Sequence, residues 1–297
     1  MNRQTNQARS ECKWKSEPLS EAVANIKLDF RRRADWEQYM LLTSDRHLDN
    51  PKSNWKMQKR HLDLAKERNA PVIDCGDLFC AMQGKYDPRS KKTDIREENR
   101  KDDYLDTLVD TAEKFFMPYK DILGVIGTGN HETAILKRLE TNLTARLIKR
   151  LHTAGSNVVA GGYRGWIRLL FSDNGKSQSF NIYYSHGSNS NAPVTKGIIK
   201  TNRHAVWLPD ADIILTGHIH ESWAFRITRA RLSQMGKEYV DSQTHIQLPT
   251  YKEEFLGSNM GFHHENGRPP KPLGAWWLRF YYCLDQERIK YEAIQAV

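Results

Sequence analysis

Five runs of apolar residues recur along this chain, and a short polar motif follows closely after each of them. The runs cover residues 39–42, 71–73, 122–126, 182–184 and 213–215. Short apolar runs bounded by polar residues are typical of strands that are buried on both faces of a sheet. We therefore expect the five motifs to lie at the C-terminal ends of buried strands, which is where open α/β sheets place their functional sites.

The five motifs carry side chains that bind metals through oxygen and nitrogen. In chain order they are Asp45-Arg46-His47, Gly76-Asp77, Gly129-Asn130-His131-Glu132, His186-Gly187 and Gly217-His218-Ile219-His220. The set contains carboxylate, amide and imidazole groups and no thiolate. Such a mixture suits manganese first, with iron or zinc as alternatives, and argues against a purely structural zinc site.

The spacing within the motifs assigns roles to individual side chains. At an extended strand end, Asp45 and His47 are two residues apart and point the same way, so both can meet one cation. Asp77 offers two carboxylate oxygens and is the natural bridge between two cations. Two cations about 3.5–4 Å apart can hold a phosphate between them and stabilise charge on its attacking and leaving oxygens.

His131 stands beside Asn130 but faces the other way. It can therefore reach the leaving oxygen as a general acid, with Glu132 orienting its ring. Each motif alone occurs often by chance, and a single histidine at a strand end is usually a structural residue. Five motifs in this order, each after an apolar run, together predict a two-metal phosphoesterase site.

The arrangement resembles the calcineurin-like metallophosphoesterase superfamily, whose pattern is D-x-H, G-D, G-N-H-[DE], H and G-H-x-H. The resemblance covers about residues 39–220. It implies a four-layer αββα sandwich with two central mixed β-sheets and a dinuclear metal centre. It also implies one metal-binding set of Asp45, His47, Asp77 and His220, a second set of Asp77, Asn130, His186 and His218, and a catalytic role for His131.

The second motif separates branches of this superfamily. Protein serine/threonine phosphatases carry an Asp-Arg pair after it, whereas this chain continues as Leu78-Phe79-Cys80. Gly-Asp-Leu-Phe is more similar to the recombination and repair exonucleases. The chain departs from those nucleases by having Glu132 where they usually carry Asp. It also shows no evident helical extension after residues 289–294, which argues against an ATPase partner.

The amino-acid composition indicates which partners and which cellular location to expect. The chain has 297 residues and a formal charge of +9, which favours polyanions such as nucleic acid. Its four cysteines, Cys12, Cys75, Cys80 and Cys283, show no paired metal spacing and read as free thiols in a reducing compartment. Neither a signal peptide nor a membrane-spanning apolar stretch is expected, so we predict a cytoplasmic protein without membrane association.

Further segments complete the expected organisation. Residues 1–34 are expected to form an N-terminal tail or peripheral segment, and residues 35–297 the metallophosphoesterase domain. Helices are expected at 103–116 and 134–152, a hairpin around Asp173-Asn174-Gly175, and an exposed insertion at 84–102. The loop 189–204 carries three candidate substrate-binding residues, Lys196, Lys200 and Arg203, with a solvated loop as the alternative. Residues 250–272 form either a long ordered loop or a lid over the site.

These observations favour hydrolysis of a phosphodiester, with DNA as one candidate substrate in a nuclease-like or exonuclease-like reaction. One alternative is a small-molecule phosphodiesterase or phosphomonoesterase. A second alternative is a non-catalytic binding scaffold on the same fold, which would be expected to lack some ligands. Here all seven ligand positions are filled: Asp45, His47, Asp77, Asn130, His186, His218 and His220.

Overall fold

Two mixed β-sheets form the centre of the molecule. The computed structural model describes residues 13–82, 94–188, 194–256, 264 and 267–296. The seven-stranded sheet has the order β1-β2-β7-β8-β9-β11-β10 and the six-stranded sheet the order β13-β12-β3-β4-β5-β6. Their bounds are β1 Trp14–Ser20, β2 Val23–Asp29, β3 Glu37–Thr43, β4 Val72–Asp74, β5 Leu123–Ile126, β6 Val159–Ala160, β7 Arg164–Asp173, β8 Lys176–Ser185, β9 Ile213–Thr216, β10 Trp223–Leu232, β11 Glu238–Gln247, β12 Ala275–Cys283 and β13 Arg288–Ala296.

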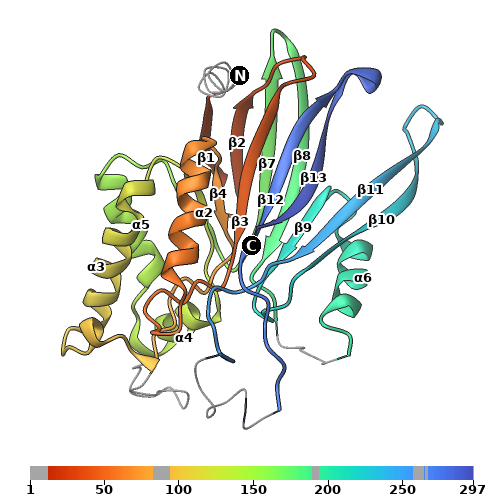
Figure 1. The fold of residues 1–297 in the computed structure, drawn as a ribbon. Coiled ribbons are helices and arrows are strands. Elements are labelled where there is room, and N and C mark those ends of the chain that lie inside the picture. The colour runs from red at the N-terminus through yellow and green to blue at the C-terminus, as the bar shows by residue number, and fades with distance from the viewer. Residues whose placement is uncertain (1–12, 83–93, 189–193, 257–263, 265–266, 297) are drawn as a thin grey trace, which may run out of the picture.

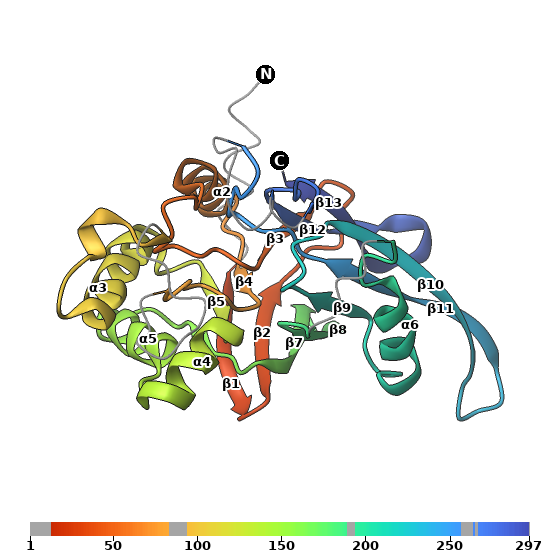
Figure 2. The ribbon, with the colours of Figure 1, turned by 90° about the horizontal axis from the view of Figure 1, so that it is seen from below.

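Helices cover the outer faces of both sheets. The α-helices are α2 Trp55–Glu67, α3 Tyr104–Phe116, α4 Asn130–Leu139, α5 Leu143–Thr153 and α6 Ile198–Trp207, and the short 3₁₀ helices are η2 Glu97–Asn99, η3 Met117–Tyr119 and η4 Leu284–Gln286. In Figure 1, α2, α3 and α5 lie on the side of the six-stranded sheet, and α6 lies beyond β9 on the opposite side. Figure 2 shows these layers end-on.

The core divides in the same way as the layers. One cluster between the two sheets includes Ile26, Met40, Ile73, Ile182 and Ile213. A second cluster lies between the six-stranded sheet and its helices, and a third, small cluster lies on the α6 side. Burying a large aliphatic side chain stabilises the fold by about 1.5–3 kcal/mol. The predicted fold class, an α/β sandwich with two central mixed sheets, is confirmed; its fourth layer is thin, with α6 as its helix among the described residues.

Within each sheet, the strands that lead into the five motifs run parallel to one another. β3, β4 and β5 pair in parallel within the six-stranded sheet, and β8 pairs in parallel with β9 in the other sheet. All five predicted apolar runs therefore form or overlap strands, and the carboxyl ends of these strands meet at one end of the sandwich. Parallel strands covered on both faces explain why these runs are apolar without alternation.

The expectation of a tail before residue 34 is wrong for residues 14–29. They form β1 and β2, which join the seven-stranded sheet through parallel pairing of β2 with β7. Ala24, Ile26 and Leu28 are buried between the sheets because alternate residues of β2 face inward. Residues 1–12, including Cys12, lie outside the described residues, and the division at residue 34 stays a prediction.

The single helix expected at 134–152 is also wrong. The chain forms α4 and α5, which are separated at Glu140, a residue with a left-handed backbone (φ 51°). Asn142 then caps α5 by accepting a hydrogen bond from the backbone N–H of Ala145. The structure also begins α4 at Asn130, four residues before the expected start, so the third motif lies at the N-terminus of this helix.

The remaining segments differ in how well they were predicted. The helix at 103–116 and the hairpin are confirmed, because α3 spans Tyr104–Phe116 and Asp173 pairs with Lys176 across the turn. The loop expected at 189–204 is wrong from residue 198, where α6 begins, and residues 189–193 lie outside the described residues. Much of the insertion at 84–102 and of the segment at 250–272 also lies outside them.

Candidate metal centre

The loops after the strands are held together by backbone hydrogen bonds. The N–H of Asp45 donates to Gly76 O at 2.9 Å, and the N–H of His47 donates to Asp77 O at 3.0 Å. In the other sheet, the N–H of Gly217 donates to His186 O at 3.1 Å. The first two motifs are therefore locked side by side, and so are the last two. This pairing continues the sheets beyond their last regular residues and fixes where the polar side chains emerge.

Glycine is required where the second and third motifs meet. A Cβ atom at Gly129 would lie 2.1 Å from Asp77 Oδ1, and one at Gly76 would lie 2.6 Å from the backbone of Thr128 and Gly129. Gly76 also has a φ of +104°, which side chains rarely adopt. The two glycines allow the Asp77 carboxylate to reach the N-terminus of α4, where the N–H of His131 donates to Asp77 Oδ1 at 3.0 Å.

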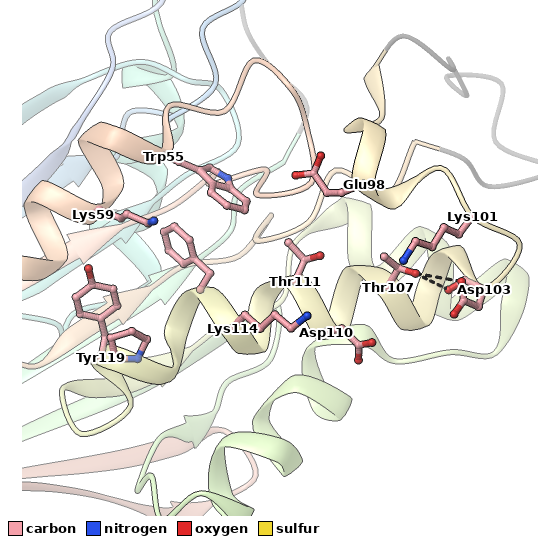
Figure 3. Close-up of a pocket in the computed structure, with 12 residues that line it drawn as sticks. Trp55, Lys59, Glu98, Lys101, Asp103, Thr107, Asp110, Thr111, Lys114 and Tyr119 are labelled. Atoms are coloured by element: carbon pink, nitrogen blue, oxygen red, sulfur yellow. Dashed lines mark hydrogen bonds between the residues drawn. The ribbon is translucent and has the colours of Figure 1, made fainter.

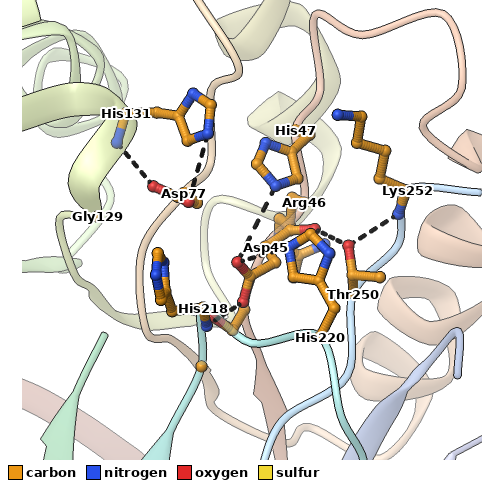
Figure 4. Close-up of polar contacts among 12 residues, drawn as sticks. Asp45, Arg46, His47, Asp77, Gly129, His131, His218, His220, Thr250 and Lys252 are labelled. Atoms are coloured by element: carbon orange, nitrogen blue, oxygen red, sulfur yellow. Dashed lines mark hydrogen bonds and ion pairs between the residues drawn. The ribbon is translucent and has the colours of Figure 1, made fainter. Parts of the chain in front are cut away.

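Three side chains from both sheets form the first group of candidate ligands. Asp45 and His47 follow β3, and His220 follows β9. One ligand atom from each lies within 4.8 Å of the other two. His220 Nε2 is 3.1 Å from Asp45 Oδ1, and His47 Nε2 is 4.0 Å from the same oxygen. Figure 4 shows these side chains converging.

The second group contains Asp77, His186 and His218, again with ligand atoms within 4.8 Å of one another. His186 Nε2 is 3.1 Å from Asp77 Oδ2 and 3.0 Å from Asn130 Oδ1. Its Nδ1 faces Cys75 O at 3.1 Å. A carbonyl oxygen only accepts, so Nδ1 carries the proton of this contact and Nε2 is the nitrogen directed at Asp77 and Asn130.

The two groups adjoin each other. The N–H of His218, in the second group, donates to Asp45 Oδ2, in the first group, at 2.9 Å. The ring centroids of His47 and His131 are 5.1 Å apart, and His131 Nε2 is 3.9 Å from Asp77 Oδ2. The structure thus brings together all seven predicted ligands and His131 at one end of the sandwich. A bridging role for Asp77 stays a prediction.

The backbone is left-handed at five of the seven predicted ligands. The φ angles are 52° at Asp45, 46° at His47, 54° at Asp77, 72° at His218 and 55° at His220. Non-glycine residues seldom adopt this conformation, and such strain concentrates at functional sites. The expectation of an extended backbone at Asp45 and His47 is therefore wrong, although the two side chains do meet in one group.

The donor set fits divalent cations. His47 is 2% exposed, and neither of its ring nitrogens has a hydrogen-bond partner among the described residues. Buried polar atoms normally have partners, so a cation beside His47 would remove an exception to this rule. The buried carboxylates of Asp45 and Asp77 supply two negative charges at the same place. The ligands are oxygen and nitrogen, as the sequence predicts.

Electrostatics distinguish the side chains. Burial raises the pKa of Asp45, but His220 outweighs it and lowers this pKa to about 2. Burial likewise raises the pKa of Asp77, but His186 and His131 hold it well below its usual value. Burial lowers the pKa of His186, whereas Asp77 and Asp45 raise it to about 10. Burial and the neighbouring His131 lower the pKa of His47 well below its usual value.

The orientation of His131 comes from a backbone carbonyl. Its Nδ1 donates to Cys80 O at 2.6 Å, which leaves Nε2 facing the two groups. The turn that supplies this carbonyl is held by Asp49, which accepts from the N–H groups of Cys80 at 2.5 Å and Ala81 at 2.7 Å. Sequence reasoning missed Asp49, and its position two residues after His47 gives no signal of this contact.

Glu132 does not contact the His131 ring in the way that the sequence analysis predicts. Its two carboxylate oxygens accept from the N–H of Phe79 at 2.9 Å and from the N–H of Gly129 at 2.7 Å. Burial, together with the charge of Asp77, raises the pKa of Glu132 to about 8. Glu132 therefore joins the loop after β4 to the start of α4, and it acts on His131 only through the backbone.

Arg46 was also missed, although it stands between two predicted ligands. Its guanidinium is fully buried and lies 2.6 Å from Asp74 Oδ2, between the rings of Phe116 and Tyr251. Because Arg46 points into the core, the residues on either side of it point to the site. Thr250 continues this support by donating its hydroxyl to Asp45 O at 2.9 Å.

The three predicted substrate-binding residues do not form one cluster of free charges. Lys200 donates to the backbone oxygen and the hydroxyl of Ser188. Lys196 lies 4.0 Å from Glu221, and its side chain is 56% exposed. Arg203 is exposed on α6. Lys200 and Arg203 thus stand on a helix near the His186 loop, and their contact with substrate stays a prediction.

A pocket of about 520 Å³ lies away from the ligand groups, between α2 and α3 (Figure 3). Trp55 and Lys59 line it from α2, and Thr111 and Lys114 from α3. None of the predicted site residues lines this pocket. Its lysines are accompanied by Glu98, Asp103 and Asp110, so it presents no net charge that would select a charged ligand.

Comparison with known proteins gives only distant likenesses. No protein-family model matches the chain, and no curated protein matches it. A predicted phosphoesterase from Streptococcus pneumoniae TIGR4 is 10% identical over 87% of this chain and 98% of its own, with a TM-score of 0.32. Zinc-bound Vps29 from Entamoeba histolytica is 10% identical over 87% of this chain and 99% of its own, with a TM-score of 0.33.

A third solved structure, GAP50 of Plasmodium, described as the anchor in the inner membrane complex, is also 10% identical. It covers 88% of this chain and 89% of its own, with a TM-score of 0.39. At these identities and TM-scores, the likenesses carry no argument about the fold or the site. The proposed function therefore depends on the residues themselves.

Within the described part of the chain, no helix is both long enough and apolar enough to cross a membrane.

Proposed function

We propose that this protein is a metal-dependent phosphoesterase of the calcineurin-like type. One observation carries the proposal: two adjoining groups, made of buried carboxylates and of buried or half-buried imidazoles, meet at the carboxyl ends of strands from both sheets, with His131 beside them. In this proposal Asp45, His47 and His220 hold one divalent cation, Asp77, Asn130, His186 and His218 hold another, and Asp77 bridges the two. Manganese is the first candidate, with iron or zinc as alternatives.

The chain's own residues divide the remaining work. Two bound cations would draw a phosphoester into the site and stabilise charge on the attacking and leaving oxygens. His131 Nε2 points toward this place, because Nδ1 is committed to Cys80 O. As an imidazolium, His131 donates the Nε2 proton to the leaving oxygen. Glu132 keeps the two loops that carry Asp77 and His131 in register.

For the substrate, we propose a phosphodiester ahead of a phosphomonoester, with nucleic acid as the first candidate and a cytoplasmic location. The charge of +9 supports a polyanion, and so do Lys200 and Arg203 on α6. A small-molecule phosphodiester would use the same ligands without needing these basic residues. The proposal includes no membrane and no ATPase partner.

A non-catalytic scaffold is the rival class. A scaffold needs neither a general acid nor strained ligands, yet the backbone is left-handed at five ligand positions. Binding of metal without any hydrolysis would favour the scaffold.

A single panel of assays tests the proposal. Protein stripped of metal and reloaded with Mn²⁺, Fe²⁺ or Zn²⁺ is incubated with a chromogenic phosphomonoester, a chromogenic phosphodiester, and single- and double-stranded DNA. We expect metal-dependent hydrolysis of the diester above that of the monoester. Equal rates with and without metal, or no hydrolysis of any substrate, would overturn the proposal. Hydrolysis of the small diester without cleavage of DNA would remove only the nucleic-acid part.

A further inference from the structure

One thiol lies at the metal centre and has no part in the proposed reaction. The Sγ of Cys80, one nitrogen of His47 and one nitrogen of His131 lie within 4.8 Å of one another. Cys80 is 1% exposed, and its sulfur accepts a hydrogen bond from Asn50 Nδ2 at 3.4 Å. A sulfur and two imidazoles are a different donor set from the two groups described above, which contain no sulfur. The soft cation Cd²⁺ prefers the set that includes thiolate, and the borderline cation Zn²⁺ binds both kinds of set.

A second observation points to a ligand at this place. His47 is 2% exposed, and both of its ring nitrogens lack a hydrogen-bond partner among the described residues. It therefore faces Cys80 and His131 without the proton donors and acceptors that buried imidazoles usually have. Because His47 belongs to both this group and the first group, a cation bound here competes for it.

The tautomer of His131 makes the competition sharper. Its Nδ1 donates to Cys80 O, so in the neutral ring Nε2 carries the free electron pair. In the proposed reaction the same Nε2 must carry the proton that goes to the leaving oxygen. One nitrogen cannot both bind a cation and hold that proton. A cation on His131 therefore removes the general acid.

The geometry requires only small movements. In a tetrahedral zinc site with bonds of about 2.0–2.3 Å, neighbouring ligand atoms are about 3.4–3.6 Å apart. Atoms that lie within 4.8 Å of one another reach that spacing through shifts on the order of 1 Å, which side-chain rotations supply. The side chain of His131 is 14% exposed, so a cation has a route into the group from solvent.

We propose that His47, Cys80 and His131 form a third metal site, selective for soft cations, whose occupation inhibits the enzyme. Binding forms a metal–sulfur bond and two metal–nitrogen bonds, and the thiol proton passes to solvent. The site draws His47 from the first group and occupies the nitrogen that His131 needs as an acid. The binding site stands on its own, whereas the inhibition rests on the proposed function.

The decisive experiment titrates Cd²⁺ into the full-length protein and follows the ultraviolet absorption of the cadmium–thiolate bond. We expect one equivalent of this absorption in the wild type and in the matched control Cys283→Ser, and its loss in Cys80→Ser. His131→Ala keeps the thiol but removes one imidazole, so it should weaken cadmium binding at least tenfold. Circular dichroism establishes that each variant is folded. An equal signal in folded Cys80→Ser, or no signal in the wild type, would overturn the proposal.

A second readout separates this site from the proposed function. With Mn²⁺-loaded protein and a chromogenic phosphodiester, each variant is compared with its own uninhibited rate as Cd²⁺ or Zn²⁺ is added. Cys80→Ser should need at least tenfold more Cd²⁺ for half inhibition than the wild type or Cys283→Ser. A thiolate signal in a protein without hydrolytic activity would leave the site standing and reject the phosphoesterase. Hydrolysis that is equally sensitive to Cd²⁺ in all three proteins would reject the inhibitory role.

Discussion

The two ligand groups are similar in composition but differ in how their charges are balanced. In the second group, His186 lies 3.1 Å from Asp77 and 3.0 Å from Asn130, so a proton on His186 satisfies all three side chains. In the first group, His47 is 4.0 Å from Asp45 and has no hydrogen-bond partner among the described residues. The second group is thus internally paired, whereas the first contains an unsatisfied imidazole.

The difference shows that a proton and a cation compete for His186 in the second group, whereas no such competition occurs at His47 in the first group. An unsatisfied buried polar group costs about 1–3 kcal/mol, so a cation beside His47 stabilises the folded protein without first displacing a proton from that ring. A cation in the second group must displace the proton of His186. Variants of the two groups test this comparison, from the largest expected effect to the smallest.

Replacing Asp77 should have the largest effect. If Asp77 bridges the groups, Asp77→Asn weakens two coordination spheres, so both ions are lost and hydrolysis falls to the level of metal-free protein. The matched variant Asp45→Asn should lose only the ion of the first group. Elemental analysis after gel filtration counts the ions per chain. An Asp77→Asn protein that keeps two ions and near-normal turnover would sink the dinuclear assignment, and one that keeps a single ion would show independent groups.

His131→Ala should come next, because a general acid need not bind the catalytic metals. Both ions should remain, and the rate should fall roughly 10²–10⁴-fold, the usual range for acid–base contributions. The loss should shrink for esters with good leaving groups, such as nitrophenyl esters, which need no proton. An equal loss on nitrophenyl and alkyl esters would count against the role of His131.

Much of the sheet architecture around the two groups could be predicted from the amino-acid sequence. The apolar runs predict β3, β4, β5, β8 and β9, because strands covered on both faces leave a continuous apolar signal. Since the carboxyl ends of such strands meet, the amino-acid sequence alone could place the motifs together. What the runs do not contain is the left-handed backbone at the ligands, which arises from tertiary contacts between loops far apart in the chain.

Other features were hidden for identifiable reasons. Leu139 and Leu143 keep helical spacing across the break at Glu140, so apolar periodicity alone could not separate α4 from α5. β2 does alternate, but its strand is preceded by the mostly exposed β1, whose pattern is polar. Adjacency in sequence suggests that Glu132 orients the ring of His131. In the structure its carboxylate instead accepts hydrogen bonds from the backbone N–H groups of Phe79 and Gly129.

The pH dependence of metal binding tests the contrast between the groups. The pKa of His186 in metal-free protein is about 10, above the ordinary 6.5, because Asp77 and Asp45 outweigh the effect of burial. Between pH 6.5 and 10, the His186 side chain therefore keeps its proton in the native state, whereas in the unfolded chain it has lost that proton. The contribution of the His186 proton to the free energy of unfolding of the metal-free protein is therefore fully present below pH 6.5, and it is lost as the pH rises through 10.

In the same window, a cation that displaces this proton should bind about tenfold more tightly for each unit of pH. His47 is neutral there, since burial holds its pKa well below the usual value, and it releases no proton. Calorimetric titration of Mn²⁺ in buffers of different ionisation enthalpy counts the protons released. Proton release that is the same in wild type and in His186→Gln would contradict the assignment.

The smallest effect concerns residues outside both groups. Changing Lys196, Lys200 and Arg203 together to Gln should flatten the dependence of duplex DNA binding on salt by a log–log slope of roughly 0.9 for each phosphate that these side chains neutralise. Hydrolysis of a small phosphodiester should be spared, because neither ligand group is touched. An unchanged salt slope would remove these residues from the substrate interface, and a loss of small-diester hydrolysis would place them nearer the metals.

The most direct test of the account is the rate of hydrolysis of a chromogenic phosphodiester as Mn²⁺ is added to metal-free protein in steps. Two adjoining groups, with Asp77 as the proposed bridge between their cations, predict negligible hydrolysis without metal and a rate that reaches its plateau at two ions per chain. A rate that is already at its maximum before any ion is added, or that reaches its plateau at one ion per chain, would contradict a dinuclear metallophosphoesterase.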